Sequence, residues 1–191
     1  MIDKEGPAAG ASLGNAGVMA TGSLVPVTVP GLLFKAPKML FSKNQPLFLR
    51  WGYLPKLTPF LLKYLKHANT KSVARIAVGL NQLLHDTPEQ HFALAQGTPA
   101  EAYIEHGDYL YAYDDKAAFE ADSYTWEVKK SGGVDFVEMD GEALSEYDPN
   151  IKNRFGYGVQ CKHHGKICDP GAYGTALADH LIATGGEIQQ N

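Results

Sequence analysis

Cysteine is scarce in this chain, because the 191 residues contain only Cys161 and Cys168. Two cysteines are too few for a disulfide framework, and free cysteine is normal in a reducing compartment, so a cytoplasmic location is expected. The chain also lacks a long uninterrupted apolar run. The stretch 6–34 has no charged residue, but prolines interrupt it and no basic segment precedes it. This pattern argues against both a signal peptide and a membrane span.

Acidic residues are missing from most of the first half of the chain. Between Gly6 and His85 there is no Asp or Glu, whereas the same stretch holds nine Lys and Arg residues. From Asp86 onward the chain has seven basic and nineteen acidic residues. The overall charge of -4 therefore hides a basic part and an acidic part, which should face different surroundings.

Hydrophobic periodicity predicts helices in the first half of the chain. Apolar residues recur at helical spacing over 30–41, 54–67 and 70–96. Pro59 is expected in the first turn of the regular part of the second helix, and Pro88 is expected to break or kink the third.

The second half alternates between strand and helix patterns. Strands are expected at 109–113, 134–139, 155–161 and 187–190, and helices at 116–131, 141–147 and 169–184. The last helix has the order of a capped start, with Asp169 as the N-cap and Pro170 in the first turn. The expected fold class is therefore α/β, or more loosely α+β mixed.

Several segments in order along the chain resemble one enzyme family. They are 2–17 (Ile-Asp-Lys-Glu-Gly-Pro-Ala-Ala-Gly-Ala-Ser-Leu-Gly-Asn-Ala-Gly), 30–38, 46–51, 107–111 and 169–173. Together they resemble the small subunit of the D-amino acid dehydrogenases, within the wider group of FAD enzymes that contains D-amino acid, glycine and sarcosine oxidases. The resemblance covers almost the whole chain, which makes it more specific than any single motif.

The resemblance implies a division of the chain into four parts. Residues 1–29 would form part of an FAD-binding, Rossmann-like lobe, 30–98 a basic amphipathic helical region, 99–168 the strands and helices of a mixed or antiparallel substrate-domain sheet, and 169–191 a helix and strand returning to the FAD-binding lobe. A glycine-rich Gly-x-Gly-x-x-Gly turn should precede the second strand of such a lobe. The chain has none there, so Met1 is expected to be an internal or misassigned start and the chain to be an internal fragment.

The leading candidate for a cofactor contact is Asp3. In a dinucleotide-binding fold, an acidic residue at the end of the second parallel strand accepts hydrogen bonds from the ribose hydroxyls, and Met1-Ile2-Asp3 reads as the end of such a strand. An ordinary surface aspartate at a strand end is the alternative. The resemblance further implies FAD contacts for Lys4, at the adenosine end, and for the small residues Ala11, Ser12, Asn15, Ala16 and Gly17. A simple turn at 15–17 fits the composition equally well.

Candidates for the substrate pocket lie in the second half. Tyr109, Tyr111 and Tyr113 alternate and so share one face of a strand. The resemblance implies a sheet laid over the flavin, so that Tyr109 and Tyr111 would border the amino acid; cross-strand core packing explains them as well. His164 is a weaker candidate, since a solvent-exposed histidine is the more common case. The stretch between Cys161 and Cys168, in which it lies, suits a short strand or hairpin, and the resemblance implies a turn there before the helix at 169.

The segment 161–168 also packs two cysteines and two histidines into eight residues, and zinc favours these ligands. The spacing differs from that of paired zinc ligands, and no metal site is predicted.

The resemblance implies oxidative deamination of a D-amino acid, with hydride passing from the α carbon to FAD and electrons going on to a quinone or another carrier. It also places the groups that clamp the substrate carboxylate mostly beyond Asn191, so the chain alone is expected to be inactive. A truncated, non-catalytic binding module, or an enzyme oxidising glycine, sarcosine or proline, is the alternative.

The basic segment 35–75 suits contact with an anionic membrane, at the inner face of the cell membrane; a soluble helix pair docked on the sheet is the other interpretation. Nucleic acid is not expected as a partner, since no recognised reading motif accompanies the charge.

Overall fold

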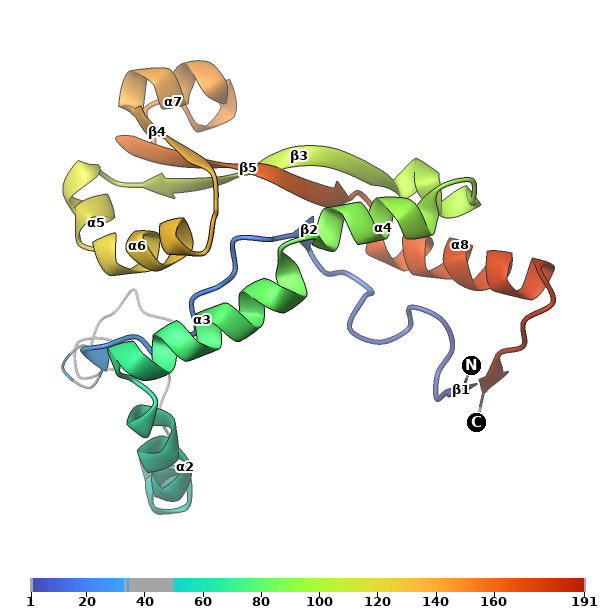
Figure 1. Cartoon of the computed structure of the whole chain (residues 1–191), viewed down its shortest axis with the longest axis horizontal. Helices are drawn as coiled ribbons and strands as arrows, with labels where there is room; N and C mark the ends of the chain where they lie inside the picture. The colour runs from blue at the N-terminus through green and yellow to red at the C-terminus, as the bar shows by residue number, and fades with distance from the viewer. Residues whose placement is uncertain (1, 33, 35–49, 191) are drawn as a thin grey trace.

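A computed structural model describes residues 2–32, 34 and 50–190. Within these residues, four strands form an antiparallel sheet centred on β5 (Figure 1): β2 (Val18–Met19), β3 (Ile104–Tyr113), β4 (Phe136–Asp140) and β5 (Tyr157–Ile167). β3 pairs along one edge of β5, whereas β4 and β2 follow one another along the other edge. A separate parallel pair joins β1 (Ile2–Asp3) to β6 (Gln189–Gln190), which brings the two ends of the chain side by side.

Helices lie around and beyond this sheet. They are α2 (Leu54–Lys66), α3 (Thr70–Leu84), α4 (Thr87–Ala95), α5 (Lys116–Glu120), α6 (Ser123–Ser131), α7 (Gly141–Tyr147) and α8 (Pro170–Ala183), with short 3-10 turns η1 (Trp51–Tyr53), η2 (Pro99–Tyr103) and η3 (Pro149–Ile151). The combination confirms the expected mixed class of helices and an antiparallel sheet. Among the described residues, no helix is both long enough and apolar enough to cross a bilayer.

Side-chain caps fix where several helices begin. The backbone N–H of Ala172 donates to the Asp169 carboxylate (2.9 Å), and Pro170 occupies the first turn of α8. α7 starts in the same way, with Asp140 accepting from Ala143 (2.9 Å). Such caps satisfy N–H groups that have no partner within the helix, and the starts of α7 and α8 are therefore as predicted.

Three predicted helices can be compared with the structure in where they begin and where they divide. The helix predicted over 70–96 divides at residues 85–86, and Pro88 sits in the first turn of α4, so the predicted break is confirmed. The helix predicted over 116–131 also divides, which was not expected, because Asp122 turns the chain and accepts a hydrogen bond from the Tyr113 hydroxyl (3.2 Å). α2 begins at Leu54 rather than near Pro59, which the helix accommodates in its interior. Most of the helix predicted over 30–41 lies outside the described residues.

Between Cys161 and Cys168 the short strand is confirmed and the turn is not, because β5 runs without a break to Ile167. Its long pairing with β3 holds this stretch extended. The register shifts where Asp108 of β3 faces both Lys162 and His163 of β5, and His163 has a positive φ of 59°. This is a β-bulge, in which one extra residue bends the strand.

Two apolar clusters form the core. One lies between the sheet and the helices α5 and α6, and its rings and side chains come from Tyr109, Tyr111, Tyr113, Phe119, Trp126, Val134, Phe136, Tyr157, Val159 and Cys161. The other joins β2, β3, α4, η2 and α8 through Met19, Ala95, Ala100, Ile104 and Tyr173. β5 passes along both clusters, because Val159 belongs to the first and Ile167 packs against the second.

Candidate functional site

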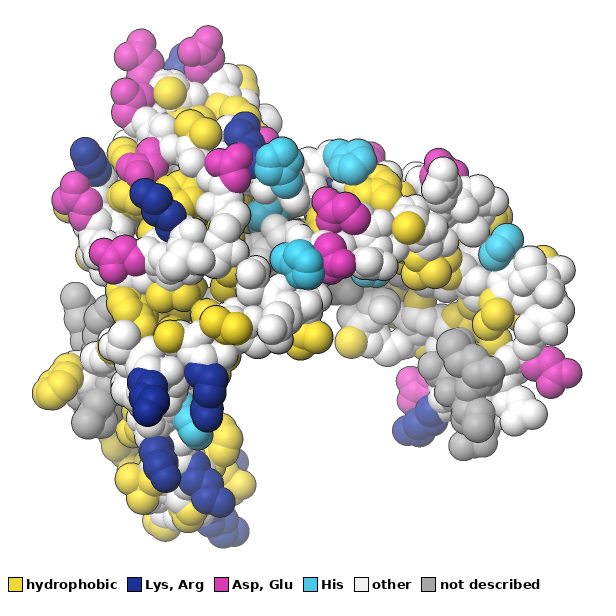
Figure 2. All heavy atoms as spheres, viewed as in Figure 1, with side chains coloured by type: hydrophobic (Ala, Val, Ile, Leu, Met, Phe, Trp, Pro, Cys, Tyr) yellow, Lys and Arg dark blue, Asp and Glu magenta, His cyan; other side chains and the backbone are white. Residues whose placement is uncertain are grey.

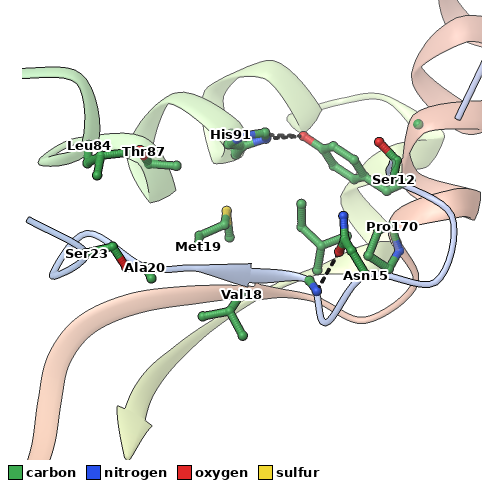
Figure 3. A pocket seen from close by; sticks show the side chains of 14 residues that line it. Ser12, Asn15, Val18, Met19, Ala20, Ser23, Leu84, Thr87, His91 and Pro170 are labelled. Carbon is green, nitrogen blue, oxygen red and sulfur yellow. Dashed lines mark hydrogen bonds between the residues drawn. The ribbon is translucent and has the colours of Figure 1, made fainter. Parts of the chain in front are cut away.

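The loop that leads into β2 separates two neighbouring clefts. Residues 9–16 of this loop are all exposed, and β2 then enters the sheet beside β5. The first cleft has a volume of about 540 Å³ and lies between this loop, α4 and α8 (Figure 3). The second, of about 270 Å³, opens over β2, β3 and β5. Some of the predicted FAD and substrate residues line one of these two clefts.

Gly17 anchors the loop to the sheet. Its carbonyl accepts a hydrogen bond from the Ile167 N–H (2.7 Å), and its φ is +66°. A Cβ atom at this position would lie 1.9 Å from the Ile167 carbonyl oxygen. Only glycine permits both this backbone conformation and this close approach. The structure therefore gives Gly17 a folding role whatever the loop binds.

Asn15 shapes the turn that brings Gly17 to β5. The Gly17 N–H donates to the Asn15 Oδ1 atom (2.7 Å), which is the hydrogen bond of an Asx-turn. The Nδ2 atom of the same side chain lies 3.5 Å from the Ala11 carbonyl oxygen, at the outer limit of a hydrogen bond. The Asn15 side chain is thus fixed through its oxygen, while its exposed amide N–H groups face the mouth of the first cleft.

The other predicted cofactor residues occupy different places. Ser12 is exposed and lines the first cleft, and Ala16 lines the second. Ala11 is exposed on the loop between them. Lys4 is exposed and pairs with its neighbour Glu5 (3.6 Å). The backbone of Asp3 lies in β1 opposite Gln190, and its side chain lies outside what the structure describes.

The second cleft brings together three predicted residues from different parts of the chain. Ala16 lines it from the loop, Tyr109 from β3 and His164 from β5. The Tyr109 and His164 rings stack with their centroids 6.1 Å apart. Tyr111 does not join them, because its ring packs edge-on against Trp126 inside the aromatic cluster. Burial there raises the pKa of Tyr111 to about 12.

His164 is only 3% exposed, whereas an exposed histidine was the more common expectation. Its Nδ1 atom lies 2.9 Å from the Lys162 carbonyl oxygen, and the Gly22 N–H approaches its Nε2 atom at 3.4 Å. These partners suit the neutral tautomer with the proton on Nδ1. Both nitrogens are therefore used by the protein, and His164 orients Tyr109 and the Gly22 segment at the cleft wall.

A histidine and a tyrosine that carried no predicted role line the first cleft. The His91 Nδ1 atom of α4 lies 3.0 Å from the Tyr173 hydroxyl of α8, and the pair bridges the two helices beside Ser12 and Asn15 (Figure 3). Burial raises the pKa of the Tyr173 hydroxyl, which is therefore protonated at neutral pH. Tyr173 falls within a segment that carries the family resemblance, but nothing in the sequence connects it with a histidine 82 residues earlier.

The cysteine and histidine residues of 161–168 do not converge on one point. Cys161 is buried in the aromatic cluster, Cys168 is exposed, and the His163 ring approaches Asp135 (3.7 Å). Among the described residues, no three His, Cys, Asp or Glu side chains are grouped so that they could hold a metal ion.

Comparison with known proteins gives matches along almost the whole chain. It is 35% identical to a D-amino-acid oxidase from Bradyrhizobium diazoefficiens over 93% of its own length and 42% of that protein. It is 25% identical to a D-amino acid dehydrogenase from Helicobacter pylori over 100% of the chain and 45% of that enzyme, and 26% identical to one from Rhizobium johnstonii over 80% and 37%. The chain thus spans less than half the length of these curated relatives.

The similarity of this chain to solved structures is weaker than its similarity to the curated sequences. A glycine oxidase from Bacillus cereus superposes with a TM-score of 0.45 and 16% identity, over 54% of this chain and 28% of that one. An L-proline dehydrogenase from P. horikoshii gives a TM-score of 0.41 and 19% identity, over 56% and 29%. These scores are too low to establish a shared fold, and no protein-family model matches the chain.

The proteins that match this chain in sequence are amino acid oxidoreductases. The chain is similar in sequence to D-amino-acid oxidase and D-amino acid dehydrogenases, which confirms the resemblance seen in the sequence.

Proposed function

We propose that this chain is part of an FAD-dependent oxidoreductase that oxidatively deaminates D-amino acids. The observation that carries the proposal is the 35% identity to a D-amino-acid oxidase over 93% of the chain. Because the chain spans 42% of that relative, the proposal concerns the activity of a whole enzyme. We expect the 191 residues alone to be inactive.

When bound, FAD would accept a hydride from the α carbon of the substrate, and the resulting imino acid would hydrolyse to a 2-oxo acid and ammonia. The protein's part is to bind, orient and exclude water. The electrons would then pass to a quinone or another carrier.

The residues present suit a flavin dinucleotide. Ser12 and Asn15 offer hydroxyl and amide donors from an exposed loop, and the alanines and glycines around them allow backbone N–H groups to approach a pyrophosphate closely. Asp3, at the end of β1, would accept hydrogen bonds from the ribose hydroxyls. Lys4, Ala11, Ala16 and Gly17 would complete the contacts.

The substrate would enter through the second cleft, beside Tyr109 and His164. In this proposal His164 is a positioning residue, because the protein already uses both of its ring nitrogens. Tyr111 packs against the aromatic cluster rather than lining the second cleft, and in this proposal it supports Tyr109, whose ring centroid lies 4.9 Å away. Glycine, sarcosine and proline remain alternative substrates, and a non-catalytic binding module is the alternative to an enzyme.

FAD binding by the chain tests the cofactor assignment directly. Titration of FAD, followed by its fluorescence, should give saturable binding that Asn15→Asp weakens about tenfold, because the substitution removes the amide donors near the phosphates and adds a negative charge but keeps the oxygen that forms the turn. Ser145→Ala, on α7 away from both clefts, is the matched control. Equal affinity in both variants would contradict the assignment of the loop.

Reduction by substrate tests the activity. A protein that carries this chain within the full length of its curated relatives should be yellow, and its flavin absorption should bleach anaerobically with D-alanine and not with L-alanine. Bleaching by L-proline or glycine instead would reassign the substrate. A bound flavin that no amine bleaches would favour the non-catalytic binding module.

We also propose a peripheral contact of the enzyme with the inner face of the cell membrane through the basic segment 35–75, of which residues 35–49 lie outside the described residues. The support for this contact is the absence of Asp and Glu between Gly6 and His85.

A further inference from the structure

Helix α2 projects away from the sheet and the other helices (Figure 1). None of its thirteen residues is buried, although nine of them are Leu, Phe, Tyr or Pro. Phe60 and Leu62 are 60% and 65% exposed, and Trp51 of the preceding turn η1 is 60% exposed. A cluster of exposed large apolar side chains usually marks a surface that binds another molecule or a membrane.

The helix is amphipathic along its whole length. Leu54, Leu57, Leu61 and Leu65 follow one another at spacings of three and four residues and therefore share one face. Its three lysines, Lys56, Lys63 and Lys66, lie on the opposite face and are all exposed. By contrast, α3 buries Val73 and Ala77 against the rest of the molecule, so it is α2 that lacks a partner among the described residues.

The charge on this helix has one sign only. No Asp or Glu occurs between Gly6 and His85, so the chain offers the three lysines no neighbouring carboxylate in sequence. Figure 2 shows basic side chains gathered over α2 and α3, whereas acidic side chains are spread over the rest of the view with a few basic ones among them. An occupant of this surface should therefore be both apolar and negatively charged.

We propose that α2 and η1 dock in the interface of an anionic lipid bilayer. In this arrangement the leucine face and Phe60 enter the acyl boundary while the three lysines contact lipid phosphates. Trp51 and Tyr53, next to the start of the helix, are the residue types that settle at the headgroup level. This inference rests on the membrane contact in the proposed function and narrows it to one helix and its preceding turn.

Other occupants fit these observations less well. Nucleic acid would use the lysines and leave the leucine face in water. The acidic surface near α7 of a second copy would likewise satisfy the charge and not the apolar face. A bilayer with anionic headgroups satisfies both faces of one helix at once.

Vesicle binding tests the proposal without reference to catalysis. The chain should co-sediment with vesicles of phosphatidylglycerol and phosphatidylcholine in equal parts, and much less with phosphatidylcholine alone. Substituting all three helix lysines by glutamine should weaken binding on the order of 100-fold, since each basic residue near an anionic surface contributes separately. Phe60→Ser combined with Leu62→Ser should weaken it about tenfold or more. The matched control is glutamine at Lys116, Lys130 and Lys152, three exposed lysines in the acidic half.

Tryptophan fluorescence distinguishes insertion from surface adsorption. Trp126 is buried, so a blue shift on adding vesicles should come from Trp51 and should vanish in Trp51→Phe. Circular dichroism of each variant checks that the fold is kept. Equal binding to neutral vesicles, loss of binding in the control triple variant, or self-association in place of vesicle binding would overturn the proposal. None of these outcomes depends on FAD binding, so the cofactor assignment stands or falls separately.

Discussion

At the residue scale, the loop before β2 depends on Gly17, which lies against the backbone of Ile167. Gly17→Ala would place a Cβ atom 1.9 Å from the Ile167 carbonyl oxygen and force an alanine into a positive φ. We expect a loss of about 2–4 kcal/mol in the free energy of unfolding, measured by urea denaturation. Gly10→Ala is the control, because no atom lies within 4 Å of its added Cβ. Similar stability of the two variants would show that β2 does not hold the loop as described.

Another prediction at this scale concerns Asp108 and the pH dependence of stability. Burial alone would raise the pKa of its carboxyl, but the hydrogen bond and charge of Lys162 (3.1 Å), with Gln160, outweigh it and lower the pKa below the usual 3.8. A lowered pKa in the folded state stabilises the fold above about pH 4, and this contribution disappears as the pH falls through the folded-state value.

Asp108→Asn should therefore lower the urea midpoint at pH 7 and lower it less at pH 3. The loss at pH 7 should stay below about 1 kcal/mol, because the pair is partly exposed and screened by solvent. A constant difference between wild type and variant at both pH values would show that the carboxylate charge is not responsible.

At the element scale, the bulge in β5 carries backbone strain that can be removed. His163 has a φ of 59°, which is unfavourable for any residue with a Cβ atom, and its exposed ring makes only a loose pair with Asp135 (3.7 Å). His163→Gly should raise the free energy of unfolding by up to about 1 kcal/mol. Thermal denaturation measures the change, and His163→Ala, which keeps the strain and loses the ring, is the comparison. A glycine variant less stable than the alanine variant would argue against a left-handed residue at the bulge.

The same elements show what the sequence could predict. α7 and α8 begin where expected, because Asp140 and Asp169 cap them from within the same segment. The break at Asp122 and the extension of β5 past Cys161 were missed, since both depend on contacts with residues distant in sequence. The turn at 15–17 depends on a hydrogen bond between residues close in sequence, and a turn was one of the two interpretations of this segment. The His91–Tyr173 pair joins two helices and has no local signal.

At the scale of the whole molecule, the described part of the chain combines a sheet-centred body with one helix, α2, in which no residue is buried. The aromatic cluster and the cluster around Met19 share β5, so the body should resist unfolding as one unit. α2 buries none of its residues, and its opening should therefore cost little free energy. Stability is thus distributed unevenly, with the lysine-bearing helix at the weak end.

Limited trypsin digestion should reveal this difference. We expect cleavage at Lys56, Lys63 and Lys66 well before cleavage at Lys129, which is 3% exposed with its ammonium 3.7 Å from the Tyr111 ring centre. Mass spectrometry of the early products should find a fragment that begins at His67, after the cut at Lys66, and retains β3, β4 and β5. Anionic vesicles should slow these cuts if α2 docks on lipid, and neutral vesicles should not. Early cleavage at Lys129 would instead mean that the aromatic cluster opens as readily as α2, and the division into a stable body and a free helix would be wrong.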